Sequence, residues 1–93
     1  MSINTGDLRK GNWVRTEFGV CRVAYVIWGD VYVYGKDGRT NYARIVEAIR
    51  IGEINISMIG KTLIAEVLRK WLFVHELQNY YYWKYHKELE LNL

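Results

Sequence analysis

The histidines are the residues of this chain whose type and spacing come closest to a metal site. His75 is followed by Glu76, which is how a zinc-protease helix begins, with two histidines one turn apart as ligands and the glutamate as base. One turn after His75 stands Asn79, a poor zinc ligand. His86 is far along the chain, about 16 Å away on a helix. The two histidines cannot share an ion, so we predict neither a metal site nor a cofactor.

The other motifs do not indicate catalysis. Gly60-Lys61-Thr62 resembles the end of a phosphate-binding loop, but that loop needs a glycine where this chain has Asn55. The single cysteine, Cys21, has no histidine or second cysteine close in sequence, so we expect an inert thiol buried in a strand. The carboxylates are scattered. We therefore expect no catalytic residues and predict that the protein is not an enzyme.

The composition fits one small globular domain. Of the 93 residues, 51% are hydrophobic and 15% are aromatic, and large rings supply burial that offsets the entropy lost on folding. One cysteine excludes an internal disulfide and suits a reducing cytosol. Apolar runs such as residues 23–28 are far shorter than the roughly 20 residues that span a bilayer. We expect a cytoplasmic protein that makes no membrane contact.

The positive charge is concentrated in the first half of the chain. The net charge is +3, and residues 1–50 hold eight Lys and Arg against five Asp and Glu, whereas residues 51–93 hold five of each. Arginines alternate there with aromatic residues, as in sites for single-stranded nucleic acid. The alternative is that the rings form core and cross-strand pairs and that the arginines are solvated. The candidate nucleic-acid-binding residues are Arg15, Arg22, Arg39, Arg44, Tyr32 and Tyr34.

The most aromatic stretch, residues 71–91, predicts an amphipathic C-terminal helix that runs on to Glu88. In a helical projection, Val74 and Leu77 lie on one side and Trp83 lies opposite, among charged residues. Exposed Trp and Tyr are enriched in protein interfaces, although Trp83 can also lie flat on a lysine stem as ordinary surface. The candidate partner-binding residues are Trp83, Tyr82, His86, Asn79 and Lys87.

Short apolar segments separated by tight turns predict an antiparallel sheet before that helix. Val23, Tyr25 and Ile27 are expected to share one face of a strand, with Arg22, Ala24 and Val26 on the other, and one of the two faces is expected to be better buried. Gly29-Asp30 and residues 36–39 are expected to form tight turns. The expected strands are residues 11–16, 20–27, 31–34, 40–42 and 48–51.

The predicted fold class is α+β. We expect a five-stranded SH3-like barrel, or an open bent sheet, packed against the C-terminal helix. The whole chain, 1–93, forms one domain, with a flexible terminus at 1–10, the barrel at 11–52 and a mainly helical part at 53–93. Ile54 and Ile56 predict a strand that ends near Gly60. Residues 62–72 favour a second short helix, although a hairpin strand entering the last helix is the alternative.

Two segments of the chain resemble a group of small uncharacterised phage, prophage and mobile-element proteins. Those proteins read approximately L-R-x-G-N-x-V near the start and V-H-x-L-Q-N near the C-terminus. This chain has LRKGNWV at residues 8–14 and VHELQN at residues 74–79. Residues 87–91 match the tail of the group, whereas residues 83–86 replace its short Thr-Gly segment. The resemblance also implies a strand just before Val74.

The resemblance implies provenance and supplies no catalytic residues. Small phage proteins commonly act by stoichiometric binding to a host factor, and inhibitors of antiphage nucleases act in this way. We therefore expect a non-enzymatic interaction protein, in the host cytoplasm if phage-encoded, with a host or defence complex as its partner. An anti-CRISPR-like inhibitor belongs to this class. A homodimer through the same helix and a nucleic-acid-binding barrel are the alternatives.

Overall fold

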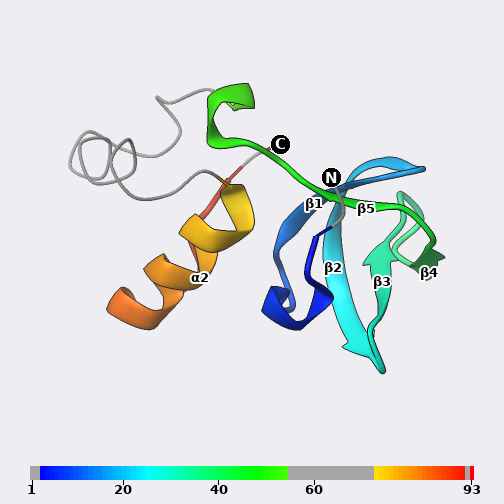
Figure 1. Cartoon of the computed structure of the whole chain (residues 1–93), viewed down its shortest axis with the longest axis horizontal. Helices are drawn as coiled ribbons and strands as arrows, with labels where there is room; N and C mark the ends of the chain where they lie inside the picture. Colours follow the sequence, from blue (N-terminus) through cyan, green and yellow to red (C-terminus); the bar gives the residue numbers. More distant parts are fainter. Residues whose placement is uncertain (1–2, 55–72, 92) are drawn as a thin grey trace.

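The computed structural model describes residues 3–54, 73–91 and 93, and within these residues a bent antiparallel sheet lies beside a helix (Figure 1). The five-stranded sheet and the C-terminal helix of the predicted α+β fold are confirmed. The elements, with η for a short 3-10 helix, are η1 (Thr5–Asp7), β1 (Trp13–Thr16), β2 (Gly19–Ile27), β3 (Asp30–Tyr34), β4 (Thr40–Ala43), β5 (Val46–Ala48), η2 (Ile51–Glu53) and α2 (Val74–Tyr85).

The strands follow the order β4-β3-β2-β1-β5, and every neighbouring pair is antiparallel. The long strand β2 serves both halves of the sheet, since its first part pairs with β1 and its second part, from Val23 onward, pairs with β3. The ladder slips by one residue between Val23 and Tyr25. Such a bulge bends and twists a strand, and it lies where β2 passes from one half of the sheet to the other.

The bulge reverses which side chains of β2 face the interior. Val23 is fully buried, the next residue Ala24 is buried as well, and Tyr25 is 40% exposed. Beyond the bulge, Val26 packs against the core and Ile27 is exposed. The prediction that Val23 shares one face with Tyr25 and Ile27 is therefore wrong, because one extra residue shifts the alternation of the strand by one position.

The hairpin between β2 and β3 turns one residue earlier than predicted. Ile27 pairs with Asp30, so the two loop residues are Trp28 and Gly29. Their φ angles are 54° and 83°, and a type I′ turn requires such positive values at both positions. Asp30, expected inside the turn, is the first residue of β3.

The fifth strand begins two residues before its predicted start at Ala48. Val46 to Ala48 pair with β1, and the chain then leaves the sheet towards η2. Ile49 and Ile51 are buried, as their alternation predicts, but they pack in a cluster with α2 instead of closing the sheet. The end of the expected strand therefore connects the sheet to the helix.

Two hydrophobic clusters form the interior of the described part of the chain. The sheet cluster lies within the bent sheet, and the helix cluster lies between α2, the segment after β5 and the C-terminal tail. The buried members of the sheet cluster are Val14, Cys21, Val23, Val31, Val33 and Ala43. The buried members of the helix cluster are Ile49, Ile51, Val74, Leu77, Leu89 and Leu91.

The chain enters α2 in an extended conformation. Phe73, inside the stretch predicted to be helical, forms an isolated antiparallel bridge with Arg50. The N–H of Val74 then donates to the carbonyl of Ile49 at 2.8 Å. The strand expected to end near Gly60, the short helix expected over residues 62–72 and the motif at 60–62 lie outside the described residues.

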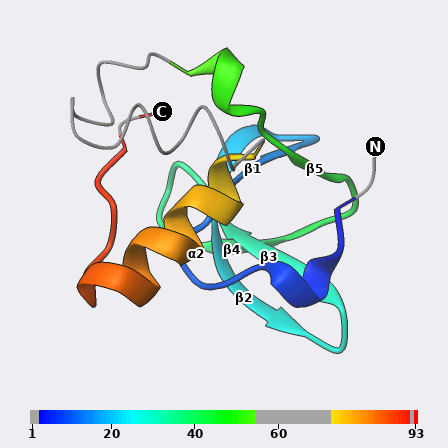
Figure 2. The same ribbon diagram turned by 60° about the vertical axis from the view of Figure 1, so that its left-hand side comes forward.

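Helix α2 ends at Tyr85, so the prediction that it runs on to Glu88 is wrong. His86 takes a φ of 57° and donates its N–H to the carbonyl of Tyr82 at 2.8 Å, a left-handed cap that ends many helices. The tail then runs back beside α2 (Figure 2), and Leu89 enters the helix cluster. Within the described part of the chain, no helix is long and apolar enough to cross a membrane.

The N-terminal segment, expected to be flexible, packs against the sheet from Ile3 onward. Asn4 caps η1, because its side-chain oxygen accepts a hydrogen bond from the N–H of Gly6 at 3.1 Å. Ile3 and Leu8 pack against the sheet cluster. This segment therefore contributes both to the core and, through the residues that follow η1, to the contact with α2.

Candidate functional site

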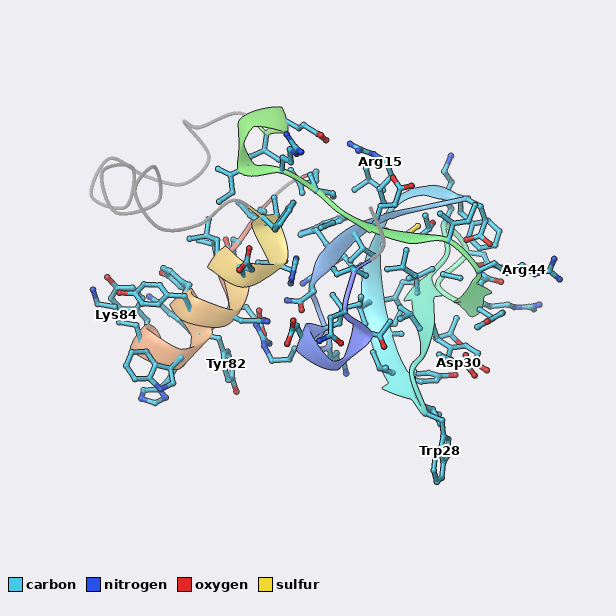
Figure 3. The ribbon with its side chains drawn as sticks, viewed as in Figure 1. Arg15, Trp28, Asp30, Arg44, Tyr82 and Lys84 are labelled. Carbon is cyan, nitrogen blue, oxygen red and sulfur yellow. The ribbon has the colours of Figure 1, made fainter. Side chains whose placement is uncertain are left out.

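The last turns of α2 expose a group of aromatic side chains. Trp83 is 74% exposed, and Tyr82 and Tyr85 are each 44% exposed. The ring of Trp83 lies 6.3 Å from the ring of Tyr80, measured between centroids. Tyr82 points outward from the helix in Figure 3. We refer to Tyr82, Trp83, Tyr85 and His86, the exposed aromatic and histidine side chains at the end of α2, as the Trp83 surface. Trp83 lies on the side of the helix where the helical projection predicts it, and Tyr82 and Tyr85 point to other sides of the same turn.

Asn79, predicted to belong to that surface, is turned towards the N-terminal segment instead. Its Oδ1 accepts hydrogen bonds from Asn12 Nδ2 at 2.9 Å and from Arg9 Nε at 3.2 Å, and its Nδ2 donates to the carbonyl of Asp7 at 2.8 Å. A side chain with three internal hydrogen bonds stabilises the fold. The predicted partner-binding residues that are exposed are Tyr82, Trp83, His86 and Lys87.

Gln78 makes a second polar contact between the helix and the sheet. Its side chain is fully buried, its Oε1 accepts a hydrogen bond from the N–H of Trp13 at 2.8 Å, and its Nε2 donates to the carbonyl of Gly11 at 3.0 Å. Both backbone groups would otherwise be buried without a partner. The sequence signal for this role is a pair of amide residues, Gln78 and Asn79, in the middle of a helix that must bury one side.

The two segments that carry the family resemblance are the two sides of this contact. Gly11 and Asn12 belong to the first motif, and Gln78 and Asn79 belong to the second. Their hydrogen bonds join residues that are 65 or more positions apart in the chain. We refer to these four residues, with Arg9, as the Gln78–Asn79 network. The motifs thus describe how α2 is attached to β1.

The first two arginines of the predicted nucleic-acid site are engaged in contacts of their own. Arg15 forms an ion pair with Glu53, and the hydrogen bond and charge of that carboxylate raise the pKa of the guanidinium. Arg22 lies over the ring of Trp13, with its guanidinium carbon 5.5 Å from the ring centroid. Arg15 is half-buried, whereas Arg22 is exposed.

The other two arginines lie at the β4 side of the sheet. Arg39 is 3.9 Å from Asp37 within the β3–β4 turn, where both side chains are largely exposed. The N–H of Arg44 donates to the two carboxylate oxygens of Glu17, at 2.8 and 3.1 Å. Desolvation acts to raise the pKa of Glu17, but these backbone hydrogen bonds outweigh it and lower the pKa. Figure 3 shows Arg15 and Arg44 at different edges of the molecule.

Three tyrosines form a row across the outer face of β2, β3 and β4. The ring centroids of Tyr25 and Tyr32 are 4.8 Å apart, and those of Tyr32 and Tyr42 are 5.6 Å apart. The three residues are direct partners in the sheet, so the row is a ladder of cross-strand ring contacts. Tyr34 lies on the same face, two residues beyond Tyr32, and is exposed.

Trp28 is the exposed residue that the sequence reasoning misses. Its side chain is 98% exposed at the tip of the β2–β3 hairpin and points away from the molecule (Figure 3). A positive φ is costly for a bulky residue, yet Trp28 adopts one. The signal in the sequence is a tryptophan directly before a glycine between two strand-like runs, because a two-residue loop leaves its side chains outside the sheet.

The histidines and the cysteine lie in separate environments. His75 is buried, with its ring centroid 6.0 Å from that of Phe73, whereas His86 is exposed at the end of α2. Cys21 is buried, and its sulfur lies 3.6 Å from Thr16 Oγ1. In the ranges that the structure describes, no three His, Cys, Asp or Glu side chains come together as metal ligands.

At the Trp83 surface, the exposure of Trp83 that the sequence predicts is also found in the structure. The exposed rings of this surface stand at the end of a helix that the Gln78–Asn79 network attaches to the sheet. The arginines of the predicted nucleic-acid site come from different parts of the sheet, since Arg15 lies on β1, Arg22 on β2, and Arg39 and Arg44 on either side of β4. No protein-family model, curated protein or solved structure matches this chain.

Proposed function

We propose that this protein is a non-enzymatic binding protein that attaches stoichiometrically to a protein partner through the Trp83 surface. One observation carries the proposal: Trp83 is 74% exposed on a well-formed helix, and Tyr82 and Tyr85 of the same helical turn are also exposed. Tryptophan and tyrosine dominate the binding energy of protein interfaces, since burying their rings releases much apolar surface from water.

The support beneath the Trp83 surface favours the same function. Gln78 and Asn79 join the helix to β1 and to the N-terminal segment, and Arg9 lies over the ring of Tyr82, 4.3 Å from its centroid. Side chains held on a fixed support lose less conformational entropy when a partner binds. The geometry is thus suited to stoichiometric binding by a preorganised surface.

The class of partner follows from the resemblance of the two motifs to phage and mobile-element proteins. Proteins of that origin commonly act on host factors, so we propose a host protein or defence complex as the partner. An anti-CRISPR-like inhibitor is one form that this activity takes, and a homodimer through the Trp83 surface is the competing arrangement. The partner class is thus inferred from the behaviour of phage and mobile-element proteins and does not depend on the fold.

Affinity purification from a bacterial host, combined with light scattering of the pure protein, tests the proposal. Trp83→Ala is expected to abolish capture of the partner. If the surface forms a homodimer instead, Trp83→Ala is expected to dissociate that dimer into monomers. The matched control is Phe18→Ala, which removes a ring that is 57% exposed in the β1–β2 turn. Unchanged capture and unchanged mass for Trp83→Ala would exclude this surface as the interface.

The variant Trp28→Ala locates the interface if it lies elsewhere. Trp28 stands at the tip of the β2–β3 hairpin, while α2 lies beside β1 on the other side of the molecule (Figures 1 and 3). Loss of the partner with Trp28→Ala and not with Trp83→Ala would assign binding to the hairpin. The protein would still be a binding protein, but its surface would be a different one.

Nucleic-acid binding is the second candidate function, and the tyrosine ladder is the observation that favours it. Tyr25, Tyr32 and Tyr42 present partly exposed rings on one face, and bases stack on such rings. Binding of this kind must weaken steeply with salt, because phosphate contacts release counterions. Titration of a labelled single strand at low and high salt tests it, with Tyr32→Ala expected to weaken binding. Salt-independent binding, or none at low salt, excludes it.

A further inference from the structure

A cavity of about 390 Å³ lies between the segment that follows η1, strand β2 and the end of α2 with the tail that follows it. Its volume falls within the range of roughly 300–1,000 Å³ that is usual for small-ligand sites. Three of the side chains that line it are cationic, and one is a carboxylate. The lining residues are Arg9, Lys10, Gly11, Arg22, Tyr82 and Glu88.

The charges of this lining leave two cations without a carboxylate. Glu88 forms an ion pair with Arg9, whose guanidinium also donates to Asn79, so the charges of the pair offset each other. The side chains of Lys10 and Arg22 form no ion pair or hydrogen bond with any residue that the structure describes. The lining therefore has a net charge of +2, which attracts an anion.

The guanidinium of Arg22 is held beside the backbone of the cavity. Its central carbon lies 5.5 Å from the centroid of the Trp13 ring, and this cation–π contact restrains the side chain. Its Nη2 lies 3.6 Å from the position that a Cβ would occupy on Gly11, so the charged group stands next to that lining residue. Because Gly11 has no side chain, a ligand can approach both the backbone and the guanidinium closely.

The charge and the size of the cavity favour an organic phosphate over a carboxylate. A phosphate monoester carries a charge of about −1.5 to −2 at pH 7, which balances the net charge of +2, whereas a carboxylate balances half of it. The paired N–H groups of a guanidinium match two phosphate oxygens. The cavity has room for more than a phosphate, and the ring of Tyr82, over which Arg9 lies, lines it. An aromatic base attached to the phosphate would meet that ring.

We propose that this cavity binds the phosphate monoester of a nucleotide, with Arg22 and Lys10 as the residues that hold the phosphate and Tyr82 beside the base. Two sources have this chemistry: a free nucleoside monophosphate, and the phosphorylated 5′ end of a nucleic-acid strand. The site is separate from the tyrosine ladder and shares only Tyr82 with the Trp83 surface. Failure of this proposal therefore leaves both proposed functions standing, and their failure leaves this site standing.

Titration with AMP, followed by NMR of the backbone amides, tests the site. AMP is expected to give saturable shifts of the resonances of Lys10, Gly11 and Arg22. Cyclic AMP has the same base but a phosphodiester with a single negative charge, and it is expected to bind about fivefold more weakly. Adenosine, which has no phosphate, is expected to leave these resonances unchanged. No saturable shift with AMP, or equal affinities for AMP and cyclic AMP, would overturn the proposal.

Matched variants separate this cavity from general charge attraction. Arg22→Gln and Lys10→Gln are each expected to weaken AMP binding by about three- to tenfold. Arg39→Gln removes the same charge in the β3–β4 turn, where the side chain of Arg39 is 87% exposed, and is expected to leave the affinity unchanged. The same spectra show whether each variant is folded. Equal effects of all three variants would show that AMP binds as an adventitious ion only.

Two short DNA strands of the same sequence, one with and one without a 5′-phosphate, distinguish the two sources. Tighter binding of the phosphorylated strand identifies the strand end as the ligand. Equal binding of the two strands, or binding of neither, identifies the free nucleotide as the ligand. In the case of equal binding, the strands are held by a surface outside this cavity, which is the result that the tyrosine ladder predicts.

Discussion

Gln78 accepts a hydrogen bond from the backbone N–H of Trp13 at 2.8 Å, and this bond joins helix α2 to strand β1. The same carboxamide donates to the carbonyl of Gly11 at 3.0 Å. The side chain of Gln78 thus pairs with one backbone donor and one backbone acceptor, as the backbone of a neighbouring strand would do at this point of the sheet. The helix is thereby fixed in position by directional bonds as well as by apolar packing.

Replacement of Gln78 by alanine is expected to destabilise the protein by about 2–4 kcal/mol, since it leaves two buried backbone groups without partners and creates a cavity. Urea denaturation followed by tryptophan fluorescence measures the change. The control is Asn41→Ala, which removes an exposed amide on β4 and is expected to change stability by less than about 0.5 kcal/mol. Equal stability of the two variants would contradict the role assigned to Gln78.

Arg9 is expected to matter more for stability than its ion-pair partner does. Its guanidinium pairs with Glu88, donates to Asn79 and covers the ring of Tyr82. Arg9→Ala is expected to cost about 1–2 kcal/mol, and Glu88→Gln less than about 1 kcal/mol, because the pair is partly exposed. Denaturation at low and high salt measures both. A larger effect for Glu88→Gln would show that the ion pair dominates.

Burial of His75 predicts a loss of stability in weak acid. The pKa of this residue is lowered from its ordinary value of 6.5 by burial, so the unfolded chain binds the proton more tightly than the folded protein does. The free energy of unfolding is therefore highest above pH 6.5 and falls as the pH drops below it, before most carboxylates titrate near about pH 4.

The variant His75→Gln is expected to flatten that part of the pH profile. His86→Gln is the matched control, since His86 is exposed at the end of α2, and it should retain the decline seen in the wild type. Urea denaturation at a series of pH values gives all three profiles. Parallel profiles for the wild type and His75→Gln would show that other groups cause the decline.

Trp83→Ala is expected to leave stability within about 0.5 kcal/mol of the wild type, as for most exposed positions. Leu77→Ala, six residues earlier on the same helix and fully buried, is expected to cost about 2–5 kcal/mol. Thermal denaturation of the two variants measures the contrast. A large loss of stability for Trp83→Ala would mean that its ring packs on the fold and does not serve as a binding surface.

The local features of the fold were predictable because they depend on neighbouring residues. β-Branched and aromatic residues predict β3, and Gly and Asp predict turns on both sides of it. The side of α2 that exposes Trp83 follows from helical spacing alone. These properties need no knowledge of distant parts of the chain.

The features that the sequence did not predict depend on long-range contacts or on one-residue choices. In the sequence, nothing distinguishes Gln78 and Asn79 from ordinary helix residues. Their role depends on Gly11 and Asn12, which lie opposite them only in the folded protein. The end of α2 at Tyr85 requires a left-handed residue, and histidine is not a usual choice for that position.

The buried residue Ala24 has a further consequence for the outer surface of the sheet. Ala24 is the extra residue in β2, so it determines on which face of the sheet every later side chain of that strand lies. For this reason Tyr25 lies on the outer face and joins Tyr32 in the ladder. Deleting Ala24 alone would exchange the inward and outward sets, bringing a phenol into the interior and expelling Val26. The stacked rings on the outer face thus depend on one additional backbone residue in β2.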